Sequence, residues 1–98
     1  MSRRTRPGDR RSPIVRFEGV AYEMHRDVVL EALVQRQVEG KFRSREEMAG
    51  LIGCSRSTVS RWMAGRNVGL QVTLKVLDAL ELSFAEVFTR WEGFQVAD

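Results

Sequence analysis

The sequence predicts an all-α domain of five helices, preceded by a basic arm and a short segment that is extended or irregular. Apolar residues recur at three- and four-residue spacing in several segments of the chain. Serines suited to helix N-caps and glycines suited to helix ends separate these segments. The length of 98 residues, with 43% hydrophobic and 30% charged residues, suits one small globular domain with a single core.

Residues 1–13 form the predicted arm. They contain both prolines of the chain and five arginines, and they show no apolar periodicity. Such a segment cannot bury enough apolar surface to offset the entropy lost on ordering. We therefore expect a flexible basic arm.

Residues 14–22 form a lead-in segment in which apolar and polar residues alternate. The phase of the alternation slips at Gly19. The pattern is compatible with a short strand carrying a bulge, with a small hairpin that turns at Glu18 and Gly19, or with an irregular approach to the first helix.

The first helix is expected from about Glu23 to Val38, and Gly40 ends it. Its apolar residues fall at helical spacing and should form one stripe that faces the core. The stripe consists of Val29, Leu30, Leu33, Val34 and Val38.

The second and third helices are expected to be short and joined by a tight turn at Gly53. Ser44 opens the second with a predicted capping box, in which its hydroxyl accepts the Glu47 N–H while the Glu47 carboxylate reaches back to the Ser44 amide. Ser55 is the expected N-cap of the third helix and Gly65 its stop. The core-facing residues of the second helix are Met48, Ala49 and Ile52.

The fourth helix has a core stripe of Leu70, Thr73, Leu74, Leu77 and Leu80. A short fifth helix opens with a capping box formed by Ser83 and Glu86, with Leu82 and Val87 as a hydrophobic staple. Three aromatic residues, Phe84, Phe88 and Trp91, are left to pack. The helical domain then spans residues 23–92, with a tail at 93–98.

The segment from Ser44 to Arg66 has the spacing of a helix-turn-helix. A small residue at Ala49 lets two helices touch, Gly53 supplies the turn, and Val59 and Trp62 face inward. Over residues 28–90, including the string SFAEVF, the chain resembles the Cro/C1 (Xre-like) helix-turn-helix repressors. The resemblance implies a five-helix, lambda-repressor-like fold and sequence-specific binding of double-stranded DNA.

The net charge of +3 hides a strong asymmetry along the chain. Residues 1–16 carry six arginines against one aspartate, a net +5, and residues 41–66 carry a net +4. Residues 67–98 carry a net −3. Positive charge on the arm and the motif, with an acidic far end, indicates a molecule oriented toward a polyanion, although solvated charged faces would give similar numbers.

The exposed face of the third helix supplies the candidate base-reading residues, because a recognition helix enters the major groove by its N-terminal part. They are Arg56, Ser57, Ser60 and Arg61, which could instead serve surface solubility. Phosphate contacts are expected at the N-terminus of the second helix, and the resemblance implies others. The full set is Ser44, Arg45, Ser55, Thr58, Arg66 and Asn67. An ion pair is an alternative for Arg45, and a turn role for Asn67. The arginines of the arm are Arg3, Arg4, Arg6, Arg10 and Arg11.

We expect neither a catalytic site nor a metal site. One cysteine (Cys54) and one histidine (His25) cannot assemble a nucleophilic set or a metal site, so we predict no catalytic residues, no metal and no cofactor. No apolar run approaches the roughly 18 residues of a membrane helix, and no secretory signal is visible. We expect a cytoplasmic protein of bacterial or phage origin. Trp62 and Trp91 are expected to be core anchors.

The predicted function is that of a transcriptional regulator that acts as a homodimer on a pseudo-palindromic operator, and the resemblance implies a repressor. Its dimer interface is predicted at Phe88, Trp91, Phe94 and Val96, at the Val15–Tyr22 segment, or at both, unless these residues cover their own core. One alternative is an antitoxin or adaptor module whose DNA binding is autoregulatory. Another is RNA or nonspecific nucleic-acid binding through the arm.

Overall fold

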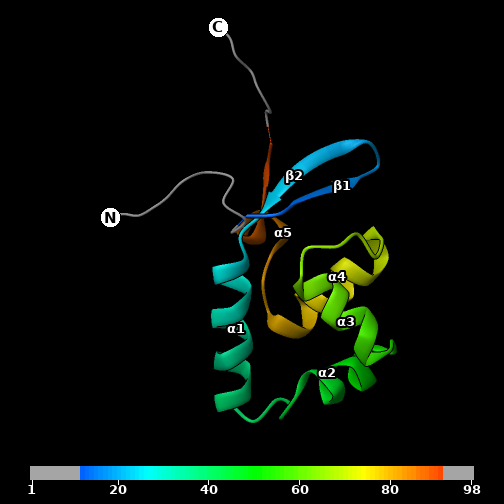
Figure 1. The fold of residues 1–98 in the computed structure, drawn as a ribbon. Coiled ribbons are helices and arrows are strands. Elements are labelled where there is room, and N and C mark those ends of the chain that lie inside the picture. Colours follow the sequence, from blue (N-terminus) through cyan, green and yellow to red (C-terminus); the bar gives the residue numbers. More distant parts are fainter. Residues whose placement is uncertain (1–11, 92–98) are drawn as a thin grey trace, which may run out of the picture.

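A short antiparallel sheet stands at one end of the helices (Figure 1). The computed structural model describes residues 12–91. In chain order the elements are β1 (Ile14–Phe17), β2 (Val20–Met24), α1 (Arg26–Val38), α2 (Arg45–Ile52), α3 (Arg56–Met63), α4 (Leu70–Leu80), α5 (Phe84–Val87) and β3 (Phe88–Arg90). The five predicted helices are therefore present. No helix of the described part is long and apolar enough to cross a membrane.

The prediction of an all-α domain is confirmed only in part, because the five helices are accompanied by three strands that form a sheet in the order β1-β2-β3. Of the three readings of residues 14–22, the hairpin is confirmed. Glu18 and Gly19 both have positive φ, 52° and 83°, as the two central residues of a type I′ hairpin turn require. The third strand follows α5 directly, and its Phe88 pairs with Met24.

The first helix begins at Arg26 and not at the predicted Glu23. Glu23 and Met24 belong to β2, where they pair with Thr89 and Phe88 of β3. Because β2 and β3 are far apart in the sequence, no pattern within residues 14–25 could predict their pairing. The end of α1 at Val38, followed by Gly40 with φ of 82°, agrees with the prediction.

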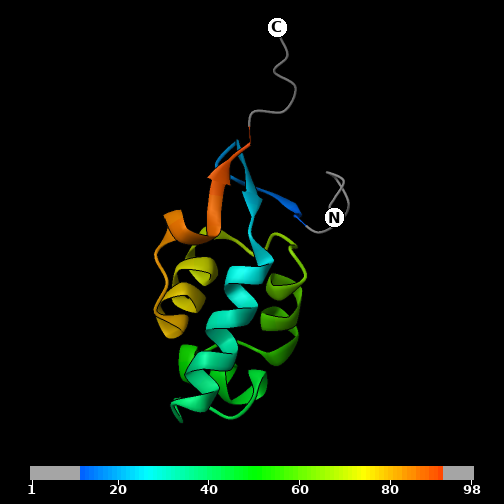
Figure 2. The same ribbon diagram turned by 90° about the vertical axis from the view of Figure 1, so that its left-hand side faces the viewer.

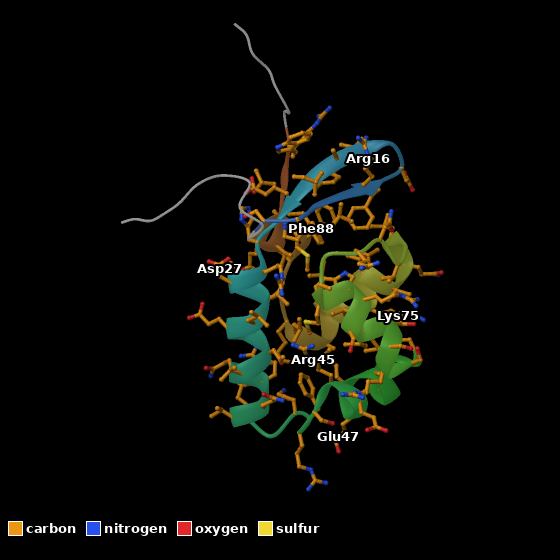
Figure 3. All side chains as sticks on the ribbon, viewed as in Figure 1. Arg16, Asp27, Arg45, Glu47, Lys75 and Phe88 are labelled. Atoms are coloured by element: carbon orange, nitrogen blue, oxygen red, sulfur yellow. The ribbon has the colours of Figure 1, made fainter. Side chains whose placement is uncertain are left out.

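An aromatic cluster joins the sheet to the helices. The rings of Phe84 and Phe88 stack at 4.7 Å between centroids, and Phe17 meets Phe88 edge-on at 5.3 Å. Trp62 of α3 reaches the same ring at 6.4 Å. Phe88 is consequently only 4% exposed and lies between the sheet and the helices (Figure 3).

The predicted stripe of α1 is divided between the core and the solvent. Val29 and Leu33 are buried as expected, together with Ala32. The other three predicted residues point outward, with exposed fractions of 38% for Leu30, 57% for Val34 and 76% for Val38. The prediction that they face the core is wrong, because at about 100° per residue they lie roughly 100° to 180° around the helix axis from the buried Val29.

The stripe of α4 needs one correction. Leu74 is half exposed, and Val76 is fully buried in its place. The buried positions Thr73, Val76, Leu77 and Leu80 follow the i, i+3, i+4, i+7 pattern of one helix face.

A polar clasp holds the C-terminal ends of α1 and α4 together. The Arg36 guanidinium donates to the Leu80 carbonyl at 3.2 Å and contacts the carboxylates of Glu39 and Glu81 at 2.9 and 3.2 Å. Lys41 adds a contact of 3.3 Å to Glu81. These contacts satisfy a terminal carbonyl of α4 and favour the left-handed conformation of Glu81, whose φ is 61°.

Candidate nucleic-acid interface

Capping serines and one glycine set the angle between α2 and α3. The hydroxyl of Ser44 accepts the Glu47 N–H at 3.1 Å, and that of Ser55 accepts the Thr58 N–H at 3.1 Å. Gly53 ends α2 in the left-handed region, with φ of 79°. The predicted N-caps and turn are therefore confirmed.

Only half of the capping box predicted at Ser44 forms. The Glu47 carboxylate accepts the N–H of Arg43 at 2.6 Å, and no bond to the Ser44 amide is made. The box predicted at Ser83 and Glu86 is complete. The two boxes differ because Glu47 accepts the backbone N–H of Arg43, the residue before the cap, whereas Glu86 accepts the N–H of the cap residue Ser83 itself.

The inward side of the motif agrees with the prediction. Ala49, Val59 and Trp62 are buried where α2, α3 and α4 meet. The Trp62 indole N–H donates to the hydroxyl of Thr73 on α4 at 3.0 Å, and that hydroxyl donates to the Gly69 carbonyl at 2.8 Å. This chain of bonds sets the rotation of α3 about its axis, and with it the set of residues that face outward.

The outward side of α3 carries the predicted base-reading residues. Arg56, Ser57 and Arg61 are exposed, and Ser60 is partly exposed. Within residues 12–91 neither Arg56 nor Arg61 takes part in an ion pair or a side-chain hydrogen bond. Both guanidinium groups are thus available to an external acceptor.

The predicted phosphate contacts differ in how far they are already engaged. Ser55 and Thr58 hydroxyls lie 2.9 Å apart within the cap of α3. Arg45 is partly buried and forms no ion pair in the described part of the chain, so the alternative proposed for it is not realised. Arg66 is exposed without a partner among the same residues.

Asn67 forms two internal hydrogen bonds, which support the turn role that was the alternative to its assignment as a phosphate ligand. Its Nδ2 donates to the Arg16 carbonyl at 2.7 Å, and its Oδ1 accepts the Gly69 N–H at 2.9 Å. The side chain therefore shapes the α3–α4 turn and ties it to β1. The turn role weighed for it from sequence is the one that the structure supports.

The structure also brings the root of the N-terminal arm to the C-terminal end of α3, which sequence reasoning missed. Pro13 lies so close to Gly65 that a Cβ on Gly65 would overlap the proline ring. The Arg26 Nε donates to the Met63 carbonyl at the same end, at 3.1 Å. The residues of these two contacts are 52 and 37 positions apart along the chain, so no local pattern indicates them.

Arg16 adds an exposed guanidinium on the hairpin beside this junction. Figure 3 shows Arg16 at the sheet end of the molecule and Glu47 at the opposite end. Exposed positive groups are therefore found on the hairpin as well as on α3.

The predicted dimer residues need correction. Phe88 is enclosed in its own core, so its side chain is not available to a partner. Val15 and Phe17 of the alternative segment are also buried beneath their own sheet. Trp91 is 43% exposed, which contradicts its assignment as a core anchor. Its backbone N–H donates to the Ala21 carbonyl at 2.9 Å. Phe94, Val96 and the five arm arginines lie outside the described residues.

Residues 12–91 bring together no group of three His, Cys, Asp or Glu side chains that could hold a metal ion. Cys54 is partly buried against the core.

Comparison with known protein families gives a match over most of the helical part. A family model described as a helix-turn-helix domain matches residues 29–87, which include all of α2, α3 and α4. No curated protein and no solved structure matches the chain.

Proposed function

The chain belongs to the helix-turn-helix domain family, and from this premise we propose that it is a sequence-specific regulator of transcription that binds double-stranded DNA. One observation carries the proposal. The α3 helix buries Val59 and Trp62 and presents Arg56 and Arg61, which have no side-chain partner within residues 12–91.

The dimensions and chemistry of α3 suit the major groove. Its eight residues make about two turns and span roughly 12 Å, close to the groove width of about 12 Å. Each arginine can bridge O6 and N7 of a guanine in a bidentate contact, whereas Ser57 and Ser60 can serve several bases. Arg56 and Arg61 are therefore the proposed main readers.

Phosphate contacts would fix the register of α3 on the duplex. The N-terminus of α2 leaves the backbone N–H groups of Arg45 and Glu46 without helical acceptors. Two further guanidinium groups come from Arg45, before α3 in the sequence, and Arg66, after it. Arg16 on the hairpin is added to this set, and Asn67 is removed from it. Such contacts position the protein without reading sequence.

We place the protein with the Cro/C1-type repressors within its family, as a homodimer that reads a pseudo-palindromic operator. Eight residues in one groove read too few base pairs to select a genomic site, and a second copy doubles the number. We propose that it acts in the cytoplasm of a bacterium or on a phage genome, by binding and without catalysis.

Selection from a pool of random duplex DNA tests the function directly. The enriched sequences should share two inverted half-sites with centres about 10 base pairs apart or a multiple of one helical turn. Replacing both Arg56 and Arg61 by Ala should abolish the enrichment. Lys75→Ala, which removes an exposed charge from α4, is the matched control and should leave the enriched motif unchanged. Equal affinity for unrelated duplexes would contradict the proposal.

A further inference from the structure

The outer face of α1 carries an apolar ridge that no described element covers. The ridge consists of Leu30, Val34 and Val38, spaced four residues apart, and its exposure rises from 38% to 76% along the helix. Residues at this spacing form one continuous ridge on a helix. In Figure 2 the helix lies in front of the others and no element of residues 12–91 is drawn over it.

The ridge is symmetric about Val34 in a way that suits a second copy of itself. Leu30 and Val38 lie four residues to either side of Val34, and Asp27 and Lys41 lie seven residues to either side. An antiparallel pair of α1 helices centred on Val34 would place each Leu30 against a Val38 and the Asp27 end against the Lys41 end. Asp27 is exposed and points away from the other helices (Figure 3), and Lys41 remains half exposed while it contacts Glu81.

We propose that this face is the dimer interface of the protein and that its occupant is the same face of a second copy, paired antiparallel about a two-fold axis at Val34. The inference rests on the proposed function, which requires two copies of α3 on one side of the DNA. A two-fold interface is self-complementary by construction, as the symmetric ridge is.

The arrangement of the helices agrees with the antiparallel pairing. In Figure 1 α1 runs vertically along the left side of the helical part, and in Figure 2 α3 and α4 lie on opposite sides of it. A two-fold axis perpendicular to the page of Figure 1 would join two antiparallel α1 helices and keep both α3 helices toward the viewer. Parallel pairing would need an axis along α1, which would turn the partner's α3 to the far side.

Exposed apolar residues on the other helices do not offer a comparable surface. Leu51 on α2 and Leu74 on α4 are exposed singly, without apolar neighbours one turn away that are equally exposed. Isolated exposed apolar residues are ordinary on protein surfaces. A ridge of only three residues buries little area, so the dimer should be weak in free solution and strengthened by DNA.

Disulfide cross-linking locates the two-fold axis. In a Cys54→Ala background, Val34→Cys should convert under mild oxidation to a species of twice the monomer mass, because each Val34 faces its counterpart. Leu74→Cys, of similar exposure on α4, is the control and should stay monomeric. Equal rates for the two variants would overturn the proposal. So would cross-linking of Val34→Cys that appears only after removal of residues 93–98, because the chain's own tail would then be the occupant.

A charge on the ridge tests the dimer and separates it from the function. Val34→Glu should sediment as a monomer and melt cooperatively, and it should bind a single half-site as the native chain does while losing the gain from a second half-site. Leu74→Glu is the control and should keep that gain. A Val34→Glu protein that sediments as the native dimer, or a native chain that stays monomeric both free and on two half-sites, would overturn the interface. If the native chain showed no preference among DNA sequences, the proposed function would be wrong. The dimer interface would still be tested, because the cross-link is measured without DNA.

Discussion

At the scale of single residues, Thr73 does more for the candidate interface than its position inside α4 suggests. It is the one fully buried polar side chain within residues 12–91. Its hydroxyl accepts from the Trp62 indole and donates to the carbonyl of Gly69, the N-cap of α4, so the packing of α3 on the start of α4 depends on one oxygen. A buried network of this kind holds one arrangement of side chains, because any other leaves a polar group unpaired.

Replacing Thr73 by Val should destabilise the protein by about 1–3 kcal/mol, since the change keeps the shape and removes both hydrogen bonds. Urea unfolding measures the loss, and the NMR resonance of the Trp62 indole N–H should shift upfield when its acceptor is gone. Thr73→Ser keeps the hydroxyl and should keep the resonance near its native position. An unshifted indole signal in the valine variant would mean that water or another group replaces Thr73.

Arg61→Ala should weaken operator binding and relax the preference at one base pair of each half-site, by about 1–3 kcal/mol for a lost bidentate contact. The native melting temperature should be kept, because the side chain is exposed and forms no ion pair or side-chain hydrogen bond within the described residues. Titration with operator variants and with random duplexes distinguishes the roles. An equal loss on both kinds of DNA would show that Arg61 contacts phosphate.

At the scale of elements, the hairpin is bound to the helices from two sides. Its buried face packs on the aromatic cluster, and its outer strand is held by the bond from Asn67 to the Arg16 carbonyl. The amide of Asn67 thus occupies part of the open edge of β1. A covered edge is protected from pairing with other chains.

Asn67→Ala should cost about 1–2 kcal/mol, the net value of two side-chain hydrogen bonds. Hydrogen exchange should quicken at the amides of β1 and at Gly69 more than at those of α1. Asn67→Asp keeps the acceptor for the Gly69 N–H and loses the donor to Arg16, so it should affect β1 alone. Unchanged exchange in β1 would indicate that the aromatic core by itself holds the hairpin.

At the scale of the whole molecule, the N-terminal arm starts where the candidate reading helix ends. Pro13 lies against Gly65, and the Pro13 carbonyl accepts the Met24 N–H at 2.9 Å, so the root of the arm is held in place. Eleven residues beyond that root can reach at most about 36–40 Å when extended. An arm of this reach and charge can follow the DNA backbone away from α3 or enter an adjacent narrow minor groove.

Deletion of residues 1–11 should reduce the affinity for every DNA sequence and leave half-site preference and melting temperature nearly unchanged. Each lost phosphate contact should lower the slope of log affinity against log salt by about 0.9. The measurement is a salt titration of operator and random duplexes with the full and shortened chains. An unchanged slope would mean that the arm does not meet the DNA, and an early melt would mean that it belongs to the core.

The sequence by itself determined the features that depend on neighbours within a few turns. The N-caps at Ser44, Ser55 and Ser83, the turn at Gly53 and the inward phase of Val59 and Trp62 all follow from local spacing, and the structure has them. The candidate reading face of α3 follows from the same phase. For residues 14–22 the sequence left three possible conformations. It could not single out the hairpin, because glutamate rarely adopts the positive φ that Glu18 has in the turn.

Only the tertiary structure decided the features that join distant parts of the chain. Pairing of β3 with β2 made the domain a mixed one and moved the start of α1, and the enclosure of Phe88 removed it from any dimer interface. The contact of Pro13 with Gly65, the bond from Asn67 to Arg16 and the exposure of the α1 ridge were equally beyond local pattern. The physical reason is that periodicity shows which residues of one helix share a face, whereas the packing of all elements decides which of its apolar faces is buried.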